Sequence, residues 1–146
     1  PPPPPPPPPP FFFQAHAGIP DAQVSRGLGD VYKRQELSEF MIQVGGIVKV
    51  NGSWIERSTK GMHHNIHNHG ATGYSAACYV CYNSSIHSPT QFVSPFNHPI
   101  TGEVMHYQPD VEEGDLILFP SFIHHYTTPN QSDTERIVLS FNLKCH

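Results

Sequence analysis

Residues 114–125 read Gly-Asp-Leu-Ile-Leu-Phe-Pro-Ser-Phe-Ile-His-His, and this stretch decides how the chain is interpreted. Its turn residues and apolar run are typical of a buried strand, which leads to His125. Eleven residues further on, Arg136 begins another β-branched, apolar segment, and far upstream His67 and His69 are separated by one residue. This order predicts a mononuclear metal site inside a small β-barrel, with Arg136 beside the metal to hold a dicarboxylate.

The three histidines are spaced as ligands of one ion would be. On a strand, residues i and i+2 point to the same face, so His67 and His69 can both turn into the barrel. His125 comes from a distant strand, and imidazole binds several transition metals, iron among them. The alternative is a merely histidine-rich surface, because residues 36–146 hold ten histidines. To that surface class we assign the remaining seven: His63, His64, His87, His98, His106, His124 and His146.

Most of the chain after residue 35 has the pattern of β-structure. No window shows helical periodicity, and Gly, Pro and Asn-Gly signals separate short β-branched or aromatic segments. Asn51-Gly52 predicts a hairpin turn, because these residues tolerate the positive φ angles of a type I′ turn. Such short strands predict an all-β sandwich or barrel. We expect strands over residues 41–50, 53–57, 62–67, 74–82, 91–93, 115–119 and 136–143, with a turn at Lys60-Gly61.

Residues 83–109 are expected to form a long loop over the mouth of the barrel, where it would select the substrate. Four prolines interrupt this segment and leave it poorly periodic. The candidates for an apolar lining that keeps water from the site are Leu116, Leu118, Phe119 and Phe141.

The chain divides at residue 35. Pro1–Pro10 is an unbroken proline run, which can form polyproline II but has no core to bury. Residues 30–35, Asp-Val-Tyr-Lys-Arg-Gln, match the translation of a sequencing-library adapter. We therefore interpret residues 1–35 as a disordered tail of artefactual origin that packs against nothing, the alternative being a genuine proline-rich ligand tail. Residues 36–146 are enough for one domain.

The expected domain is acidic. Residues 36–146 carry five Lys/Arg and ten Asp/Glu, a net charge of −5 with histidine neutral. An acidic domain without a basic stripe is a poor candidate for nucleic-acid binding. No apolar run approaches the roughly 20 residues of a membrane helix. We expect a cytoplasmic protein with neither a nucleic-acid nor a membrane partner, and a homodimer is left open.

The chain has three cysteines, Cys78, Cys81 and Cys145, and the first two are expected to be buried, reduced, structural thiols. Cys78-x-x-Cys81 suggests a redox or zinc site, but a spacing of three on a strand sends the two side chains to opposite faces. No second pair completes a zinc site. An odd number of cysteines also fits a reducing cytosol.

Together these motifs make residues 53–143 resemble a small iron(II)/2-oxoglutarate oxygenase family related to the prolyl 4-hydroxylases. The matching motifs are Trp54, Lys60-Gly61, His67-Asn68-His69, the aromatic strand Ser75–Tyr79, Gly114–His125 and Glu135–Asn142. The resemblance implies a double-stranded β-helix in which His67 and His125 hold iron(II) and Arg136 binds the far carboxylate of 2-oxoglutarate. It also implies O2 as a cosubstrate and hydroxylation of a small-molecule or peptidyl substrate that the sequence leaves unidentified.

Two positions depart from the usual pattern of such enzymes. His69 stands where most of them have a carboxylate, so the predicted site has three neutral ligands and is one unit more positive. Val138 stands where other members of the superfamily have a serine that contacts the cosubstrate. We expect Ser140 or Tyr79 to supply that hydroxyl instead.

The rival interpretation is a cupin, which uses the same barrel for isomerases, thiol dioxygenases and binding proteins. The spacings Gly61-x5-His67-x-His69 and Gly114-x5-Pro120-x4-His125 resemble the two cupin motifs. Against it, the cupin glutamate after the His-x-His pair is replaced by Gly73 and Tyr74. Arg136 also has no usual role in a cupin. A catalytically dead binding module is a third class, which would be expected to have lost one of the site residues.

Overall fold

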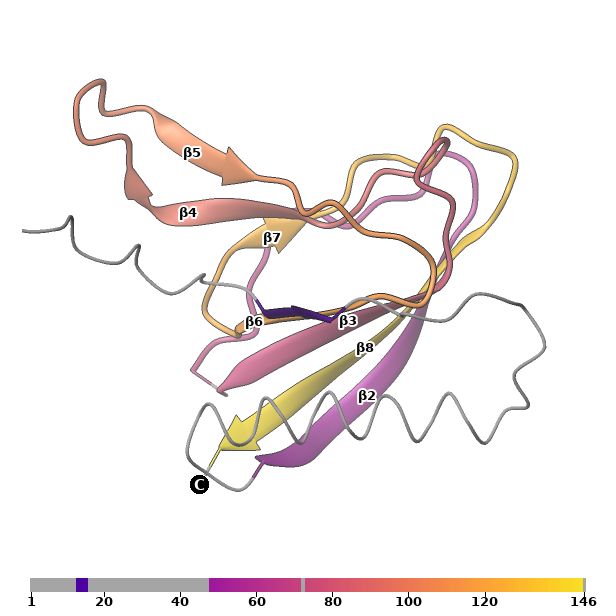
Figure 1. Cartoon of the computed structure of the whole chain (residues 1–146), viewed down its shortest axis with the longest axis horizontal. Helices are drawn as coiled ribbons and strands as arrows, with labels where there is room; N and C mark the ends of the chain where they lie inside the picture. Colours follow the sequence, from indigo (N-terminus) through magenta and orange to yellow (C-terminus); the bar gives the residue numbers. More distant parts are fainter. Residues whose placement is uncertain (1–12, 16–47, 72, 146) are drawn as a thin grey trace, which may run out of the picture.

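The computed structural model describes residues 13–15, 48–71 and 73–145, and these residues form β-strands without a helix. Two antiparallel sheets face each other, with the strand orders β1-β6-β3-β8-β2 and β5-β4-β7 (Figure 1). This arrangement confirms the predicted all-β, double-stranded β-helix. The strands are β1 (Phe13–Ala15), β2 (Val48–Ser58), β3 (Tyr74–Cys81), β4 (Gln91–Asn97), β5 (Val104–Tyr107), β6 (Leu116–Pro120), β7 (His125–Tyr126) and β8 (Arg136–Cys145).

The larger sheet has a buried cluster on each face, as the alternation of side chains on β6 shows. Ile117 and Phe119 belong to the cluster that reaches Phe92 of β4, so that cluster lies between the two sheets. Leu116 and Leu118 belong to the other cluster, together with Leu143 and, partly buried, Phe141. Of the four residues predicted to line the site, Phe119 alone faces the space between the sheets. The prediction is wrong for the other three residues, which belong to the cluster on the opposite face, because successive strand residues point to opposite faces.

The predicted hairpin at Asn51-Gly52 is wrong. Strand β2 passes straight through these residues and pairs with β8 from Val48↔Cys145 to Ser58↔Arg136. A shift in register between Val50 and Gly52 marks a β-bulge, and Gly52 has a φ of 153°. The bulge takes up the conformational freedom that the Asn-Gly pair offers, so the strand continues instead of reversing. The part of the expected strand at 41–47 lies outside the described residues.

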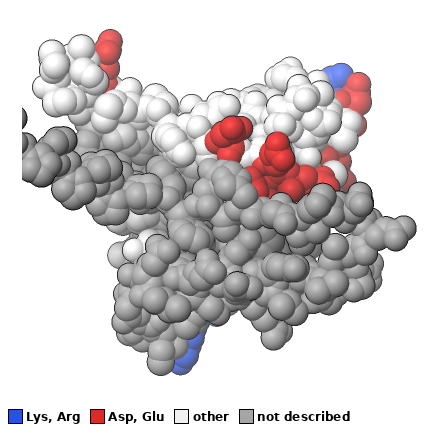
Figure 2. Space-filling view, in the orientation of Figure 1, with Lys and Arg blue, Asp and Glu red and all other residues white. Residues whose placement is uncertain are grey.

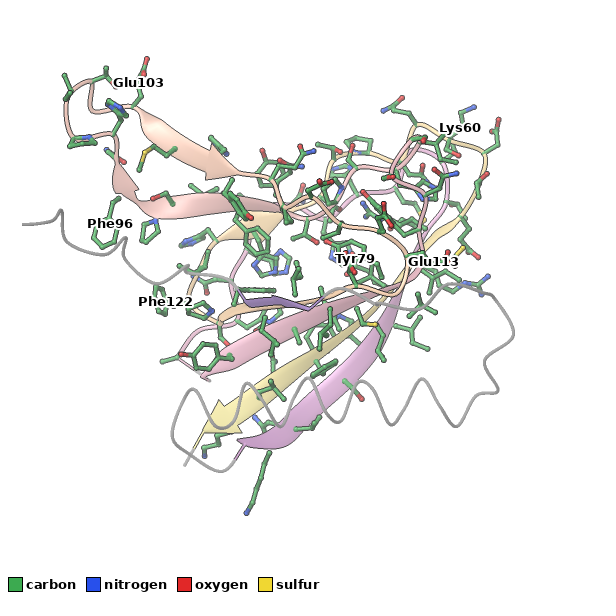
Figure 3. The ribbon with its side chains drawn as sticks, viewed as in Figure 1. Lys60, Tyr79, Phe96, Glu103, Glu113 and Phe122 are labelled. Carbon is green, nitrogen blue, oxygen red and sulfur yellow. The ribbon has the colours of Figure 1, made fainter. Side chains whose placement is uncertain are left out.

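The expected loop at 83–109 contains a hairpin that the sequence did not reveal. The predicted strand at 91–93 extends to Asn97 as β4, and β5 returns beside it. Figure 3 places Phe96 and Glu103 at the far end of this hairpin, well away from the centre of the barrel. The hairpin therefore extends the smaller sheet outward, and only its inner part, around Phe92, contributes to the core.

Residues 13–15 form β1, which pairs with β6 through Phe13↔Leu118, Gln14↔Ile117 and Ala15↔Leu116. The prediction that residues 1–35 pack against nothing is therefore wrong for these three residues. Backbone groups at the edge of β6 find hydrogen-bond partners in them, as a sheet edge favours. The rest of that segment lies outside the described residues.

Acidic side chains predominate among the charged ones on the described part of the face in Figure 2. Two surface pairs join the few basic residues to acidic ones: Arg57 with Glu135 and Lys60 with Asp133, each at 2.9 Å. Within the described residues, no helix has the length and apolar character needed to cross a membrane.

Candidate metal centre and its cavity

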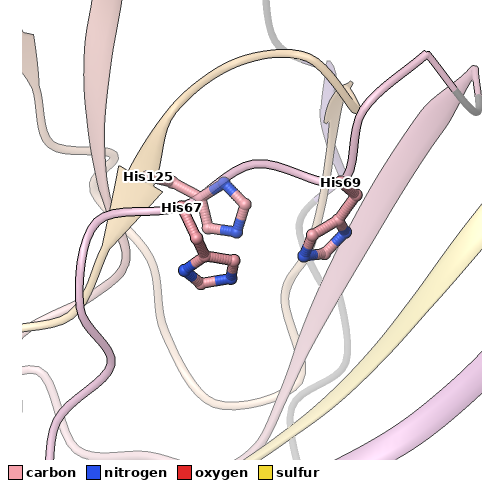
Figure 4. A group of neighbouring side chains, drawn as sticks. All are labelled: His67, His69 and His125. Atoms are coloured by element: carbon pink, nitrogen blue, oxygen red, sulfur yellow. The ribbon is translucent and has the colours of Figure 1, made fainter.

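The backbones of His67 and His125 lie directly opposite each other. Each residue donates its N–H to the carbonyl oxygen of the other, at 3.0 Å and 2.9 Å, which forms an isolated bridge between the segment before β3 and strand β7. Side chains of such a pair leave the backbone on the same side. The two imidazole ring centroids are accordingly 4.4 Å apart (Figure 4).

His69 completes the group from the other side of the same space. Its N–H donates to the carbonyl oxygen of Ser121 at 2.8 Å, and its ring lies 5.3 Å from that of His67 and 5.0 Å from that of His125. One ligand nitrogen from each of the three histidines lies within 4.8 Å of the others. Two nitrogens that share an ion at about 2.1 Å are at most about 4.2 Å apart. Small adjustments would therefore bring all three to one metal, and the predicted triad does come together.

All three imidazoles have Nδ1 engaged with an oxygen acceptor. His67 Nδ1 lies 2.7 Å from the carbonyl oxygen of Asn65, and His125 Nδ1 lies 3.0 Å from that of Ile123. His69 Nδ1 lies 2.8 Å from Oδ1 of Asn142. A carbonyl oxygen only accepts, so Nδ1 carries the proton and Nε2 of the neutral ring keeps its lone pair. Three Nε2 atoms form a donor set that fits a transition metal such as iron(II).

Asn142 anchors a small buried network behind His69. Its Oδ1 also accepts a hydrogen bond of 2.8 Å from the hydroxyl of Ser75, which lies 2.9 Å from that of Ser121. Groups of this kind orient metal ligands and fix their tautomers. The sequence analysis included Asn142 in a motif but gave it no role, because its contact with His69 depends on how β8 is placed against the segment before β3.

Burial favours the neutral forms of His125 and His69. Loss of contact with water lowers the pKa of His125 to about 4, despite the hydrogen bond to Ile123 that favours the charged form. Burial also lowers the pKa of His69, against the opposing effects of Asn142 and the negative charge of Glu56. Desolvation dominates both groups, and the neutral imidazole is the form that binds metals.

Arg136 is buried on the inward face of the larger sheet, with 2% of its surface exposed. Strand alternation places it on the same side as Val138 and Ser140, which line the cavity described below. Its Nη1 donates to the carbonyl oxygen of Ser88 at 2.7 Å and its Nη2 to the hydroxyl of Ser58 at 3.3 Å. Its Nε is buried without a hydrogen-bond partner. Among the described residues, Arg136 forms no ion pair, whereas its neighbour Glu135 pairs with the exposed Arg57.

The two predicted hydroxyl donors lie in different surroundings. Ser140 is 7% exposed and lines the cavity, two residues from Val138. Tyr79 is fully buried near the centre of the molecule (Figure 3), and its hydroxyl donates to Oγ1 of Thr90 at 3.2 Å while it accepts from Thr90 N at 3.1 Å. Its electrostatic interaction with Arg136 indicates that the two side chains are neighbours. Both assignments stay predictions, and Ser140 has the more accessible hydroxyl.

A cavity of about 270 Å³ is lined by the three candidate metal ligands. Its walls include the three histidines, Ser140 and apolar residues such as Phe119 and Val138. Trp54 and Glu56 also line it, both from β2, and the sequence analysis gave neither a role in the site. Their spacing of two would have placed them on one face of a strand, but nothing in the sequence identified that face as the inner one.

One histidine assigned to the surface is buried. His87 is 5% exposed, with Nδ1 accepting from the N–H of Asn83 at 3.1 Å and Nε2 3.2 Å from the carbonyl oxygen of Thr134. The prediction is wrong for His87 because a count of histidines says nothing of their burial. His64 is exposed as predicted, although it also lines the cavity. His146 lies outside the described residues.

Cys78 and Cys81 are both free thiols, and Cys78 is buried as predicted, whereas the predicted burial of Cys81 is wrong because that residue is only partly buried. Cys78 packs in the outer apolar cluster of the larger sheet, whereas the thiol of Cys81 lies 3.5 Å from the carbonyl oxygen of Glu135. The pair therefore forms neither a disulfide nor a shared metal site.

Comparisons with known proteins agree on one fold and one family. A family model described as "Putative 2OG-Fe(II) oxygenase" matches residues 52–142. An oxidoreductase of the 2OG-Fe(II) oxygenase family from Burkholderia pseudomallei is similar at 15% identity and a TM-score of 0.59, over 82% of this chain and 56% of that one. A Pseudomonas putida prolyl-4-hydroxylase is similar at 13% identity and a TM-score of 0.60, over 92% and 84%.

HygX from Streptomyces hygroscopicus, solved with nickel and 2-oxoglutarate bound, is similar at 11% identity and a TM-score of 0.58, over 92% of this chain and 81% of that one. Identities this low establish the fold alone. The chain spans little more than half of the length of the Burkholderia protein. No curated protein matches the chain.

Proposed function

The chain belongs to the 2OG-Fe(II) oxygenase family, and from this premise we propose that it is an iron(II)- and 2-oxoglutarate-dependent dioxygenase that hydroxylates its substrate. Iron(II), 2-oxoglutarate and O2 are the cofactor and cosubstrates that the family uses. In our proposal His67, His69 and His125 hold the iron through Nε2, and Arg136 binds the distal carboxylate of 2-oxoglutarate. Residues 36–146 would form the catalytic domain.

The observation that carries this proposal is the burial of Arg136 on the cavity side of the larger sheet. A guanidinium group is costly to bury without an anionic partner. Arg136 has two hydrogen bonds to neutral oxygens and an Nε without a partner. Its planar group can make two parallel bonds to a carboxylate. A dicarboxylate that reaches from the histidines to Arg136 would supply the missing negative charge.

Iron(II) would supply a centre at which O2 is activated by two electrons from the 2-oxo acid, which is oxidised to succinate and CO2, so that one oxygen atom can hydroxylate a substrate C–H bond. The chain's own residues do the rest. His67 and His125 are aligned by their reciprocal backbone bonds, so their Nε2 atoms are positioned without cost at the time of binding. Phe119 and Val138 line the cavity and limit the access of water. Ser140 offers a hydroxyl to the cosubstrate from the same wall.

The cupin alternative predicts a different place for Arg136. An arginine without a role in the site would be expected at the solvent face, paired with Glu135 or Asp133. Those two carboxylates pair instead with Arg57 and Lys60. The substrate of the proposed reaction is a small molecule or a peptidyl side chain. We also place the protein in the cytoplasm, in keeping with the free thiols of Cys78 and Cys81.

The test is consumption of 2-oxoglutarate by the purified protein loaded with iron(II). We expect a visible absorption band when 2-oxoglutarate is added without oxygen, and formation of succinate when O2 is admitted. 2-Oxobutyrate lacks the distal carboxylate and serves as the matched control. It should bind far more weakly than 2-oxoglutarate, because Arg136 has nothing to pair with. A protein that binds iron yet never consumes 2-oxoglutarate would contradict the proposal and favour the cupin alternative.

A further inference from the structure

We propose that the substrate is an organic cation, an amine or an amine-bearing side chain, whose positive charge is recognised by Glu56. This inference rests on the proposed function and names the substrate class of the same cavity. Glu56 lies on the inward face of β2, where it pairs with Val138 of β8. It lines the cavity together with the three candidate metal ligands.

Glu56 is the only fixed charge among the described residues that line the cavity. Its side chain is 15% exposed, and Nδ1 of His64 lies 3.1 Å from its Oε1. That contact has the distance of an ion pair but not the geometry of a hydrogen bond, so Oε1 is buried without a hydrogen-bond partner. A buried carboxylate oxygen is costly unless a donor meets it. A substrate ammonium group would be such a donor.

Glu56 lines the cavity, whereas Arg136 is buried beside it on the same face of the sheet. Arg136 pairs with Ser58 and Glu56 with Val138, so the acid and the base occupy successive inward positions on neighbouring strands. The distal carboxylate of 2-oxoglutarate is attracted by Arg136 and repelled by Glu56. We therefore expect 2-oxoglutarate to bind with its distal carboxylate at Arg136, and the substrate to bind next to Glu56. Opposite charges at these two neighbouring positions give each ligand one preferred place.

The neighbours of Glu56 suit a small cation. Trp54, two residues earlier on the same face, lines the cavity with its ring centroid 5.3 Å from that of His69. Tyr126 lines it as well. Aromatic faces attract ammonium groups, and the attraction grows when the site is shielded from water. A cavity of about 270 Å³ is small for a ligand site, so after 2-oxoglutarate binds it has room for one compact amine or one side chain.

The test uses three probes of nearly equal size, namely benzylammonium, benzyl alcohol and benzoate. Trp54 is the chain's only tryptophan and lines the cavity, so its fluorescence reports binding there. The protein is loaded with iron(II) and 2-oxoglutarate without oxygen, and each probe is titrated. We expect benzylammonium to bind at least about tenfold more tightly than benzyl alcohol, and benzoate to bind most weakly.

Glu56→Gln keeps the shape of the side chain and removes its charge. In this variant we expect benzylammonium to lose about tenfold in affinity and benzyl alcohol to change little. Glu103→Gln is the matched control, since Glu103 is exposed at the far end of the β4–β5 hairpin (Figure 3). It should leave all three affinities as they are. A wild-type protein that binds the three probes equally would overturn the proposal.

Two other roles for Glu56 give different results. If the only role of Glu56 is to orient His64, then His64→Gln should abolish the preference for benzylammonium as fully as Glu56→Gln does. Our proposal instead requires that the preference persists in His64→Gln. If Glu56 is a fourth metal ligand, Glu56→Gln should lower the affinity for iron(II) itself, measured without any probe. Either result would overturn the inference. Failure of the wild-type protein to bind 2-oxoglutarate would instead contradict the proposed function.

Discussion

The two ends of the proposed site, the three histidines and Arg136, are held in opposite ways. At the histidine end, each Nδ1 has a defined oxygen acceptor and the backbones of His67 and His125 bond to each other. At the other end, Arg136 makes two hydrogen bonds to neutral oxygens and leaves Nε without a partner. At the first end every Nδ1 has an oxygen acceptor. At the second end the guanidinium has an Nε–H without a partner, which an anion could accept. Substitutions at the two ends should therefore separate metal binding from cosubstrate binding.

Loss of a candidate ligand should have the largest effect. His125→Ala removes the most deeply buried of the three nitrogens, so iron(II) affinity should fall by more than about 100-fold, beyond what loss of a supporting group causes. Isothermal titration without oxygen measures the change. His124→Ala is the matched control, since His124 is the adjacent, exposed histidine and contacts Asn68. If His125→Ala still binds iron tightly, His125 is not a ligand and the histidine end is not the metal site.

Arg136→Ala should weaken 2-oxoglutarate and leave iron(II) binding largely intact. Loss of the charged partner of a buried carboxylate costs about 2–5 kcal/mol, which corresponds to a Kd raised by roughly 30-fold to several thousand-fold. Arg136→Lys should recover only part of this, because a point charge cannot make two parallel bonds. Arg57→Ala serves as the control, since it removes an exposed arginine from the same region. Thermal melting must show that each variant is folded, and equal losses of iron and 2-oxoglutarate would contradict the separation.

Asn142→Leu should have a smaller effect, confined to the histidine end. It removes the acceptor of His69 Nδ1–H, and loss of such a supporting group typically lowers metal affinity about 10–100-fold. Asn142→Asp keeps an acceptor oxygen at the same place and should recover most of the affinity. The measurement is again iron(II) titration. If both variants bind iron like the wild type, His69 is not a ligand, and the site has only two protein nitrogens.

The smallest expected effect is a loss of folding stability at high pH, caused by Tyr82, which interacts electrostatically with Arg136. Burial raises the pKa of Tyr82 to about 12, against an ordinary value of about 10, and the nearby Tyr79 adds to the shift. The unfolded chain therefore loses this proton at lower pH than the folded one, and stability falls as pH rises from about 10 to 12. We expect about 1–2 kcal/mol of this loss to come from Tyr82, because the phenolate can relax toward water.

Tyr82→Phe should flatten the decline between pH 10 and 12 in urea-unfolding curves. It should also lower stability at neutral pH by about 1 kcal/mol, because the hydroxyl donates a hydrogen bond of 3.0 Å to the carbonyl oxygen of His87. If the free energy of unfolding of Tyr82→Phe falls with pH as steeply as that of the wild type, the loss of stability between pH 10 and 12 arises from other groups.

The sequence was sufficient to predict the residues whose chemistry depends on local spacing. The spacing of His67 and His69 predicted that both rings enter one site, and they do, although the expected strand at 62–67 is wrong because that segment makes only an isolated bridge at His67. The run that ends in His125 has few other interpretations. The inward position of Arg136 follows from its place at the start of a strand in a recognised motif. These parts could be predicted because one short window contains both the ligand and the structure that presents it.

The remaining parts depend on which strands become neighbours. Asn51-Gly52 has the local signal of a hairpin, yet β2 continues because β8 offers partners along its whole length. The link between Asn142 and His69 joins residues 73 positions apart in the chain. Glu56 has no signal of its own until β2 is placed beside β8 with a defined register. Such contacts require the tertiary structure, and single-sequence patterns do not contain it.

The reciprocal bridge between His67 and His125 has a further consequence for how the protein acquires iron. A zinc finger cannot fold before its metal arrives, because the metal supplies most of its folding free energy. Here the ligand backbones are already paired by peptide hydrogen bonds. Because peptide groups and not the imidazoles make this bridge, we expect it to survive removal of the ion. The measurement is hydrogen exchange of the His67 and His125 amides with and without a chelator.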